Sequence, residues 1–233
     1  WNRFKDKELG LKYNGKEKED ENFTRAALAM VENIDYNVGR VFDKLKVLGL
    51  EENTIVLYLS DNGPNGWRWN GGMKGKKGST DEGGVRSPLV MQWKGNLPPG
   101  EHIPQIASSI DLLPTLADLA GISAKTLNPV DGQSLKSLLL QPNAEWPSRI
   151  VYNYWQGATS IRTQKYRLDK DNKLYDMETD MGQTTDISER MPQLTDSLKN
   201  LKEVWLVDVK PQTNIEDNRP FPLGDPDFAY TQL

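Results

Sequence analysis

Hydrophobic and polar positions change their period along the chain, and each change marks a new element. From residue 21 to residue 48, apolar side chains recur at steps of three and four, which predicts an amphipathic helix that ends at Gly49. Residues 54–59 are an apolar run without polar alternation, as expected of a parallel strand covered on both faces. A helix followed directly by such a strand is half of a β-α-β unit.

Further along, residues 89–93 (LVMQW) form another apolar run, bounded by a proline and by the turn sequence GNLPPG, and they predict a second core strand. Within residues 106–120 the pattern predicts a short helix that Asp111 caps and Gly121 ends. Residues 134–140 add one or two helical turns. The first part of the chain therefore alternates helices and strands.

The pattern then shifts to closely spaced short strands, which predict an antiparallel meander over residues 149–155, 158–163, 165–169 and 173–176. A helical period returns at 191–209 and can cover that meander. We predict an α/β fold with three parts: an α/β portion over 1–145, a small antiparallel sheet with a helix over 146–210, and an extended tail over 211–233. The proline-rich tail has no period, so it wraps the surface or is loose.

Composition narrows the class of protein. The 233 residues are 36% hydrophobic, which is enough for a real core. The chain has 29 Lys and Arg against 33 Asp and Glu, a formal net charge of −4. This charge gives no general attraction to nucleic acid or to an anionic membrane. No apolar run approaches the roughly 20 residues of a membrane span. The absence of cysteine excludes disulfides, thiolate metal sites and a cysteine nucleophile from this chain.

Candidate chemistry begins where the strand at 54–59 stops. Asp61 and Asn62 offer a carboxylate and an amide oxygen, the ligands that Ca²⁺ and Mg²⁺ prefer, and Gly63 permits the backbone bend that lets both reach one ion. On its own, the tripeptide DNG is better explained as a simple Asx turn that ends a strand. Two ligands also do not complete a six- or seven-oxygen site.

A glycine-rich basic loop follows, with Lys74, Lys76 and Lys77 interleaved among glycines. Glycine lets a backbone approach an anion closely, and lysine supplies point charge, so a tetrahedral oxyanion is the natural partner. The alternative is a flexible, solvated turn. The spacing is not that of a Walker A loop.

The sequence SDNGP followed by KGSTDEGGVRSP resembles the second signature region of the sulfatase family, in the alkaline-phosphatase-like superfamily. The resemblance extends over residues 26–180 and includes AMVENIDYNVGRVFDKLKVLGLEENTIV, ASSIDLLPTLADLAG and SIRTQKYRLDKDNKLYDMETD. It implies part of a mixed sheet flanked by helices, followed by the family's small C-terminal subdomain.

The resemblance also implies roles for particular residues. Asp61 and Asn62 would be ligands of the active-site cation, most often Ca²⁺ with Mg²⁺ as an alternative, and Lys77 would be the catalytic lysine that contacts the substrate sulfate. Positions that brace the loop would be Glu82, Gly83, Gly84 and Arg86. Substrate contacts are expected from Arg68, Trp69, Asn70 and Lys74, although packing explains Trp69 and its neighbour Trp67 at least as well.

Other features of the family do not occur in this sequence. Neither CxPxR nor SxPxR, the motif in which formylglycine is made, occurs here, nor do the paired N-terminal aspartates. The single histidine, His102, belongs to a predicted surface loop. The chain therefore resembles the C-terminal half of a sulfatase whose nucleophile lies upstream. We expect it to be inactive alone, to pair with the missing N-terminal half, and to associate through the apolar faces that this half would cover.

The predicted activity of the whole protein is hydrolysis of a sulfate ester on a sugar or aryl alcohol. Two alternatives remain: a phosphoester or phosphonate hydrolase of the same superfamily, and a non-catalytic, sulfatase-like binding domain. Because bacterial sulfatases are commonly exported, the resemblance also implies a periplasmic or secreted protein.

Overall fold

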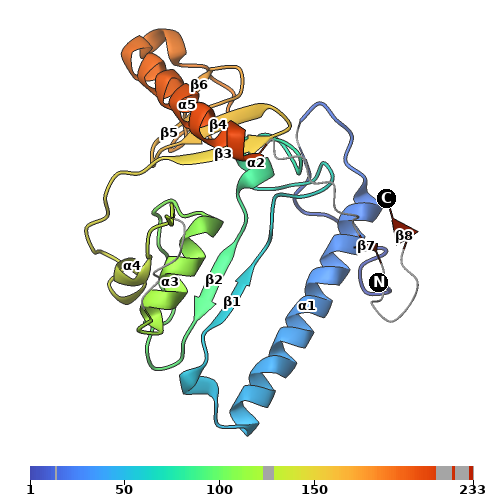
Figure 1. The fold of residues 1–233 in the computed structure, drawn as a ribbon. Coiled ribbons are helices and arrows are strands. Elements are labelled where there is room, and N and C mark those ends of the chain that lie inside the picture. Colours follow the sequence, from blue (N-terminus) through green and yellow to red (C-terminus); the bar gives the residue numbers. More distant parts are fainter. Residues whose placement is uncertain (14, 123–128, 214–221, 224–230, 233) are drawn as a thin grey trace.

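The computed structural model describes residues 1–13, 15–122, 129–213, 222–223 and 231–232. Figure 1 shows a long helix along one side, a two-stranded sheet beside it, and a separate four-stranded sheet with its own helix at one end. A mixed α/β architecture with a small antiparallel sheet and a C-terminal helix is thus confirmed. Within the described ranges, no helix has the length and apolar character needed to cross a membrane.

Helix α1 (Glu21–Val47) agrees with the predicted amphipathic helix. Asp20 caps it, because its carboxylate accepts a hydrogen bond from the Phe23 amide at 3.0 Å. The helix stops at Leu48, and Gly49 follows with a positive φ of 67°, a conformation that glycine adopts without strain. A short 3-10 helix, η1 (Glu51–Asn53), then leads into the first strand.

Strands β1 (Val56–Leu59) and β2 (Leu89–Gln92) pair antiparallel, with Val56 opposite Gln92 and Leu59 opposite Leu89. The sequence predicted a parallel strand at residues 54–59, but its partner within the described residues, β2, runs antiparallel to it. Parallel strands need a crossover, usually a helix, whereas the only helix between β1 and β2 in the described chain is the single turn α2 (Glu82–Val85). Full cover on both faces is not found either, since Tyr58 and Val90 are exposed.

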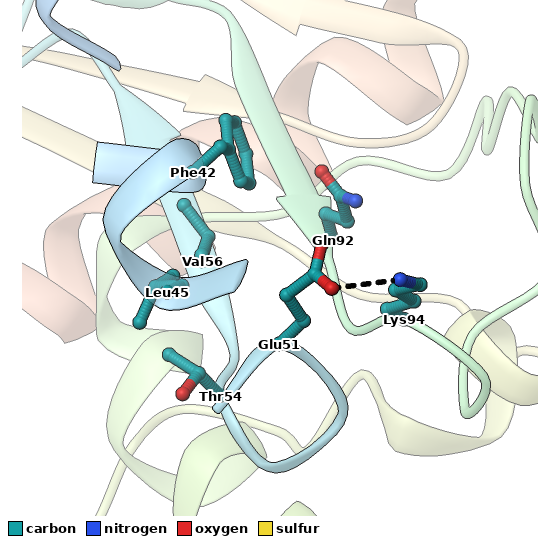
Figure 2. Close-up of a pocket in the computed structure, with 7 residues that line it drawn as sticks. All are labelled: Phe42, Leu45, Glu51, Thr54, Val56, Gln92 and Lys94. Carbon is teal, nitrogen blue, oxygen red and sulfur yellow. Dashed lines mark hydrogen bonds and ion pairs between the residues drawn. The ribbon is translucent and has the colours of Figure 1, made fainter. Parts of the chain in front are cut away.

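The C-terminal end of helix α1 packs against the end of this sheet that lies farthest from the glycine-rich loop (Figure 1 and Figure 2). Figure 2 shows Phe42 and Leu45 of α1 facing Val56 of β1, with the Glu51 and Lys94 side chains paired at 2.9 Å beside them. The contact is small. Much of the remaining apolar surface of α1 is exposed.

A third layer contains η2 (Ser109–Asp111), α3 (Leu112–Leu119) and α4 (Lys136–Leu140). The predicted capping of α3 by the Asp111 side chain is wrong. The Asp111 carboxylate instead accepts the Ser108 amide at 2.7 Å in a capping box at η2. It also accepts two hydrogen bonds from the Arg149 guanidinium, at 2.6 and 2.9 Å, so a fully buried ion pair ties this layer to the start of the second sheet.

The predicted antiparallel meander is confirmed. Its strands are β3 (Val151–Trp155), β4 (Ala158–Arg162), β5 (Tyr166–Leu168) and β6 (Leu174–Asp176), in the spatial order β3-β4-β5-β6. After η3 (Ser188–Arg190), helix α5 (Pro192–Thr213) covers them. It continues three residues into the segment predicted as an extended tail. Of that tail, β7 (Pro222–Leu223) pairs with β8 (Thr231–Gln232), and the rest beyond residue 213 lies outside the described residues.

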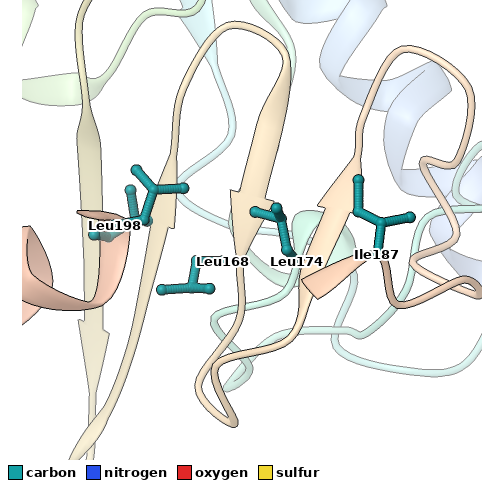
Figure 3. Packing of buried hydrophobic residues seen from close by; sticks show 5 residues of the cluster. Leu168, Leu174, Ile187 and Leu198 are labelled. Atoms are coloured by element: carbon teal, nitrogen blue, oxygen red, sulfur yellow. The ribbon is translucent and has the colours of Figure 1, made fainter. Parts of the chain in front are cut away.

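The meander and α5 enclose a hydrophobic core of their own. Figure 3 shows Leu168 and Leu174 from the strands, Ile187 from the segment before η3, and Leu198 from α5 meeting at its centre, where Ile161 completes the cluster. Tyr152 stacks on Trp205 with ring centroids 4.8 Å apart and so attaches the edge strand to the helix. We call β3 to β6 with η3 and α5 the C-terminal subdomain.

Candidate functional site

The turn at residues 60–64 and helix α2 lie backbone to backbone. The Gly63 amide donates to the Gly84 carbonyl at 2.9 Å, and a Cβ at Gly63 would lie 1.8 Å from the Gly83 carbonyl oxygen. Only glycine fits such an approach. On the other side, the Ser87 hydroxyl donates to the Ser60 carbonyl at 2.7 Å. These contacts hold the Asp61 and Asn62 turn against the end of the basic loop.

The basic loop is attached to the same turn. The Lys77 amide donates to the Pro64 carbonyl at 2.9 Å, and the Gly83 amide donates to the Lys74 carbonyl at 2.7 Å. Gly75 and Gly78 have φ values of 90° and 86°, in the left-handed region. The structure therefore brings the predicted metal ligands and the predicted anion loop into one site.

The three lysines of this loop differ in their surroundings. Lys74 lies 3.5 Å from the Asp81 carboxylate, 3.6 Å from the Asp169 carboxylate and 5.4 Å from the Tyr175 ring centroid. Lys76 lies over the indole of Trp67, 5.0 Å from its centroid, and Trp67 in turn stacks on Tyr13.

The Lys77 side chain, in contrast, is exposed, and within the described ranges its ammonium has no hydrogen-bond or ion-pair partner. Of the three, Lys77 is the lysine whose charge is free for an external anion.

Asp169 is the more deeply buried of the two carboxylates beside Lys74. This carboxylate is almost fully buried and accepts the Tyr175 hydroxyl at 3.2 Å. Burial, and secondarily the Asp169 charge, raises the pKa of Tyr175 well above its ordinary value, so the phenol stays protonated and donates. The ammonium of Lys74 balances the buried negative charge beside it.

The two predicted metal ligands have side chains that make no hydrogen bond of their own within the described residues. Asp61 is exposed, Asn62 is half-buried, and neither side chain has a hydrogen-bond partner in the part of the chain that the structure describes. That part also contains no group of three or more His, Cys, Asp or Glu residues placed to hold a metal. The donors fit a hard divalent cation in type, but a complete site needs further oxygens.

The residues predicted to contact the substrate differ in burial and in the protein groups they contact. The Arg68 guanidinium lies 4.9 Å from the Phe23 ring centroid, and burial lowers its pKa while the Glu19 charge opposes that shift. Asn70 donates to the Gly75 carbonyl at 3.3 Å and so supports the loop. Trp69 is 41% exposed beside the loop. His102 is exposed, as predicted for a surface loop.

A buried charge cluster anchors the loop to the C-terminal subdomain. Glu82 accepts hydrogen bonds from Arg167 at 2.7 and 3.0 Å and from Arg162 at 3.2 Å. Arg167 also donates to the Thr80 carbonyl at 2.7 Å, as does the Ser160 hydroxyl. Burial alone would raise the pKa of Glu82, but the charges of Arg167 and Arg162 outweigh it, so the pKa lies below its ordinary value.

Gln183 adds a second attachment to the same helix start. Its side-chain oxygen accepts from the Glu82 amide at 3.0 Å, and its amide nitrogen donates to Asp81 at 3.1 Å. Sequence analysis identified Glu82 as a bracing residue but missed Arg167, Ser160 and Gln183. Since these partners lie 80 to 101 residues beyond the segment they bind, no local pattern marks them.

Comparison with known proteins agrees with this geometry. The sulfatase family profile matches residues 2–122, and the profile described as N-sulphoglucosamine sulphohydrolase, C-terminal, matches residues 76–207. The chain belongs to the sulfatase family.

Two relatives show how much of a full-length sulfatase this chain matches. A sulfatase of Formosa agariphila is 29% identical over 94% of this chain and 47% of its own length. Human arylsulfatase A is 39% identical over 58% of this chain and 28% of its own length. The chain thus spans less than half of these relatives.

Solved structures agree. A protein in complex with its substrate D-glucosamine-2-N,6-O-disulfate superimposes with a TM-score of 0.64 and 25% identity, over 88% of this chain and 45% of that one. PsFucS1 sulfatase from Pseudoalteromonas has a TM-score of 0.67 at 22% identity, over 82% of this chain and 44% of that one, and shows the shared fold.

Proposed function

We propose that this chain is the C-terminal portion of an enzyme that hydrolyses sulfate esters, with a sulfated sugar as the preferred substrate class. The observation that carries the proposal is the free ammonium of Lys77, held by its own amide next to the Asp61 and Asn62 turn in a chain of the sulfatase family. The sugar preference is supported by the disulfated glucosamine bound to the solved relative and by the sulphohydrolase profile over residues 76–207.

In this proposal the residues of the site have three different roles. Lys77 binds a sulfate oxygen and offsets the negative charge that builds up as the ester bond breaks. Asp61 and Asn62 would help to hold a divalent cation, Ca²⁺ or Mg²⁺, which supplies polarisation of the sulfate oxygens when bound. Lys74 and Asn70 keep the loop in shape through Asp81, Asp169 and the Gly75 carbonyl.

We further propose that the nucleophile, a formylglycine, belongs to an N-terminal half of the same protein. This chain contains no CxPxR or SxPxR motif and spans less than half of its relatives, and much of the apolar surface of α1, β1 and β2 is exposed. The purified 233-residue chain should therefore not turn over an aryl sulfate. Turnover by this chain, free of other sulfatases, would contradict the proposal.

The decisive experiment uses the full-length protein. Lys77→Ala should lower kcat/KM for a sulfated monosaccharide by about 10²- to 10³-fold, the effect of removing one group that stabilises developing charge. Lys76→Ala is the matched control, because the Lys76 ammonium lies over the Trp67 ring and is not directed at the anion. This variant should change kcat/KM by less than about threefold. Near-full activity in Lys77→Ala would overturn the assignment. Turnover of a phosphate ester in place of the sulfate ester would favour the phosphoester hydrolase reading.

A further inference from the structure

Trp155 is an exposed aromatic residue at the edge of the candidate site. It ends β3, opposite Ala158 on β4, at a tight hairpin turn in which Gln156 and Gly157 have φ values of 46° and 85°. Its indole Nε1 lies 3.9 Å from the position that a Cβ would take at Gly78, the residue after Lys77. The side chain is 53% exposed and makes no hydrogen bond within the described ranges.

The C-terminal subdomain fixes Trp155 relative to Lys77. Ser160, on the strand paired with β3, donates to the Thr80 carbonyl at 2.7 Å, and Arg167 of β5 donates to the same carbonyl and to Glu82. Thr80 stands just after Gly78 in the loop. Because these partners are buried, their hydrogen bonds connect the base of the hairpin firmly to the loop. The indole is therefore held beside Gly78, the loop residue that follows Lys77.

The pairing of these two groups defines a ligand chemistry. An indole face offers a flat apolar surface, and a lysine ammonium on the adjoining loop offers a point charge for an oxyanion. A pyranose ring that carries a sulfate ester presents the matching pair, a face of C–H groups next to three charged oxygens. A ligand site of this kind combines apolar contact with a few directed polar groups.

On the basis of the proposed function, we propose that Trp155 is a specificity-determining residue that stacks on the sugar ring whose sulfate is bound at Lys77. Trp155 does not contact the reacting atoms. It raises the affinity for substrates with a ring in that position and leaves the affinity for the bare anion unchanged. The C-terminal subdomain would then contribute to substrate choice as well as to the support of the loop.

The test compares two ligands in the full-length protein: D-glucosamine-2-N,6-O-disulfate as substrate and inorganic sulfate as an inhibitor without a ring. Trp155→Ala should raise KM for the sugar by about tenfold, the usual cost of removing a contacting tryptophan, with kcat within about threefold. Inhibition by inorganic sulfate should not change. Trp155→Phe should restore most of the affinity. Tyr154→Ala, the neighbouring exposed aromatic on the opposite face of β3, is the control and should leave KM unchanged.

The outcomes separate the two proposals. An unchanged KM for the sugar in Trp155→Ala would overturn the role of Trp155. Equal weakening of the sugar and of inorganic sulfate would also overturn it, because it would show that Trp155 only supports Lys77. A wild-type protein that neither hydrolyses the sulfated sugar nor binds inorganic sulfate through Lys77 would instead contradict the proposed function. A urea-unfolding midpoint for each variant checks that the fold is retained.

Discussion

The C-terminal subdomain and the α1–β1–β2 region of this molecule bury their apolar residues very differently. In the subdomain, Ile161, Leu168 and Leu174 are completely inaccessible to solvent. Along α1, by contrast, Met30, Ile34 and Val41 are exposed, although their spacing marks them as one side of an amphipathic helix. Both regions have the local sequence pattern of buried elements, but only the subdomain contains the partners that bury them.

This difference indicates where the chain is self-sufficient. A helix pattern of this kind is stabilised mainly by packing of its apolar face, so α1 needs a surface that the described residues do not supply. The subdomain has its own core and uses it to hold the site loop through Glu82 and Arg167. The candidate site is thus anchored on the well-packed side of the molecule.

The largest expected effect comes from breaking the link between loop and subdomain. Arg167→Ala leaves the buried Glu82 carboxylate without its main partner and the Thr80 carbonyl with the Ser160 hydroxyl as its remaining donor, so the free energy of unfolding should fall by about 3–5 kcal/mol. Urea unfolding measures this loss. Arg86→Ala is the control: it also faces Glu82, at 3.4 Å, but it is exposed and should cost less than about 1 kcal/mol. Equal losses in both variants would contradict the buried cluster as the anchor.

A matched pair of core and surface truncations tests the packing contrast directly. Leu174→Ala removes a fully buried side chain from the subdomain core and should lower the free energy of unfolding by about 2–5 kcal/mol. Val41→Ala shortens an exposed side chain of α1 and should change it by less than about 0.5 kcal/mol. If Val41→Ala proved as costly as Leu174→Ala, α1 would be packed in solution and the contrast would be wrong.

Acid should weaken the same anchor. The pKa of Glu82 is lower in the folded protein than its ordinary value of 4.5, so ionised Glu82 stabilises the fold above that pH and this contribution is lost as the pH falls through the folded pKa. The difference in unfolding free energy between wild type and Glu82→Gln should therefore be largest at neutral pH and should shrink below about pH 4.5. A difference that stayed constant down to pH 2 would exclude Glu82 as the source.

The smallest effect on stability, but a clear one on assembly, is expected from the exposed face of α1. Replacing Met30, Ile34 and Val41 together by serine should leave the unfolding free energy nearly unchanged and reduce concentration-dependent association of the 233-residue chain. Sedimentation velocity over a range of concentrations measures this. Val207→Ser, an exposed apolar position on α5, should not alter association. A wild-type chain that is monomeric at every concentration would contradict the prediction.

Local patterns were sufficient to predict most elements of this fold. The four strands of the meander agree with their predicted ranges because short turns such as QG and KDN separate them, and α1 ends at Gly49 as its pattern requires. The antiparallel pairing of β1 with β2 and the ion pair of Asp111 were not predicted. Both depend on distant partners: β2 runs antiparallel to β1, and Arg149 binds Asp111 from 38 residues further along the chain.

The sequence by itself determined the order of elements, the DNG turn and the glycine-rich basic loop, because periodicity and backbone freedom are properties of near neighbours. The tertiary structure decided which lysine of that loop is free. Lys74 pairs with Asp169, Lys76 lies over Trp67, and Lys77 remains exposed. It also placed Trp155 beside Gly78 and Arg167 on Glu82. Trp155, Arg167 and Asp169 all belong to the C-terminal subdomain, far along the chain from the loop residues they contact, and only the packing of the subdomain against the loop brings them together.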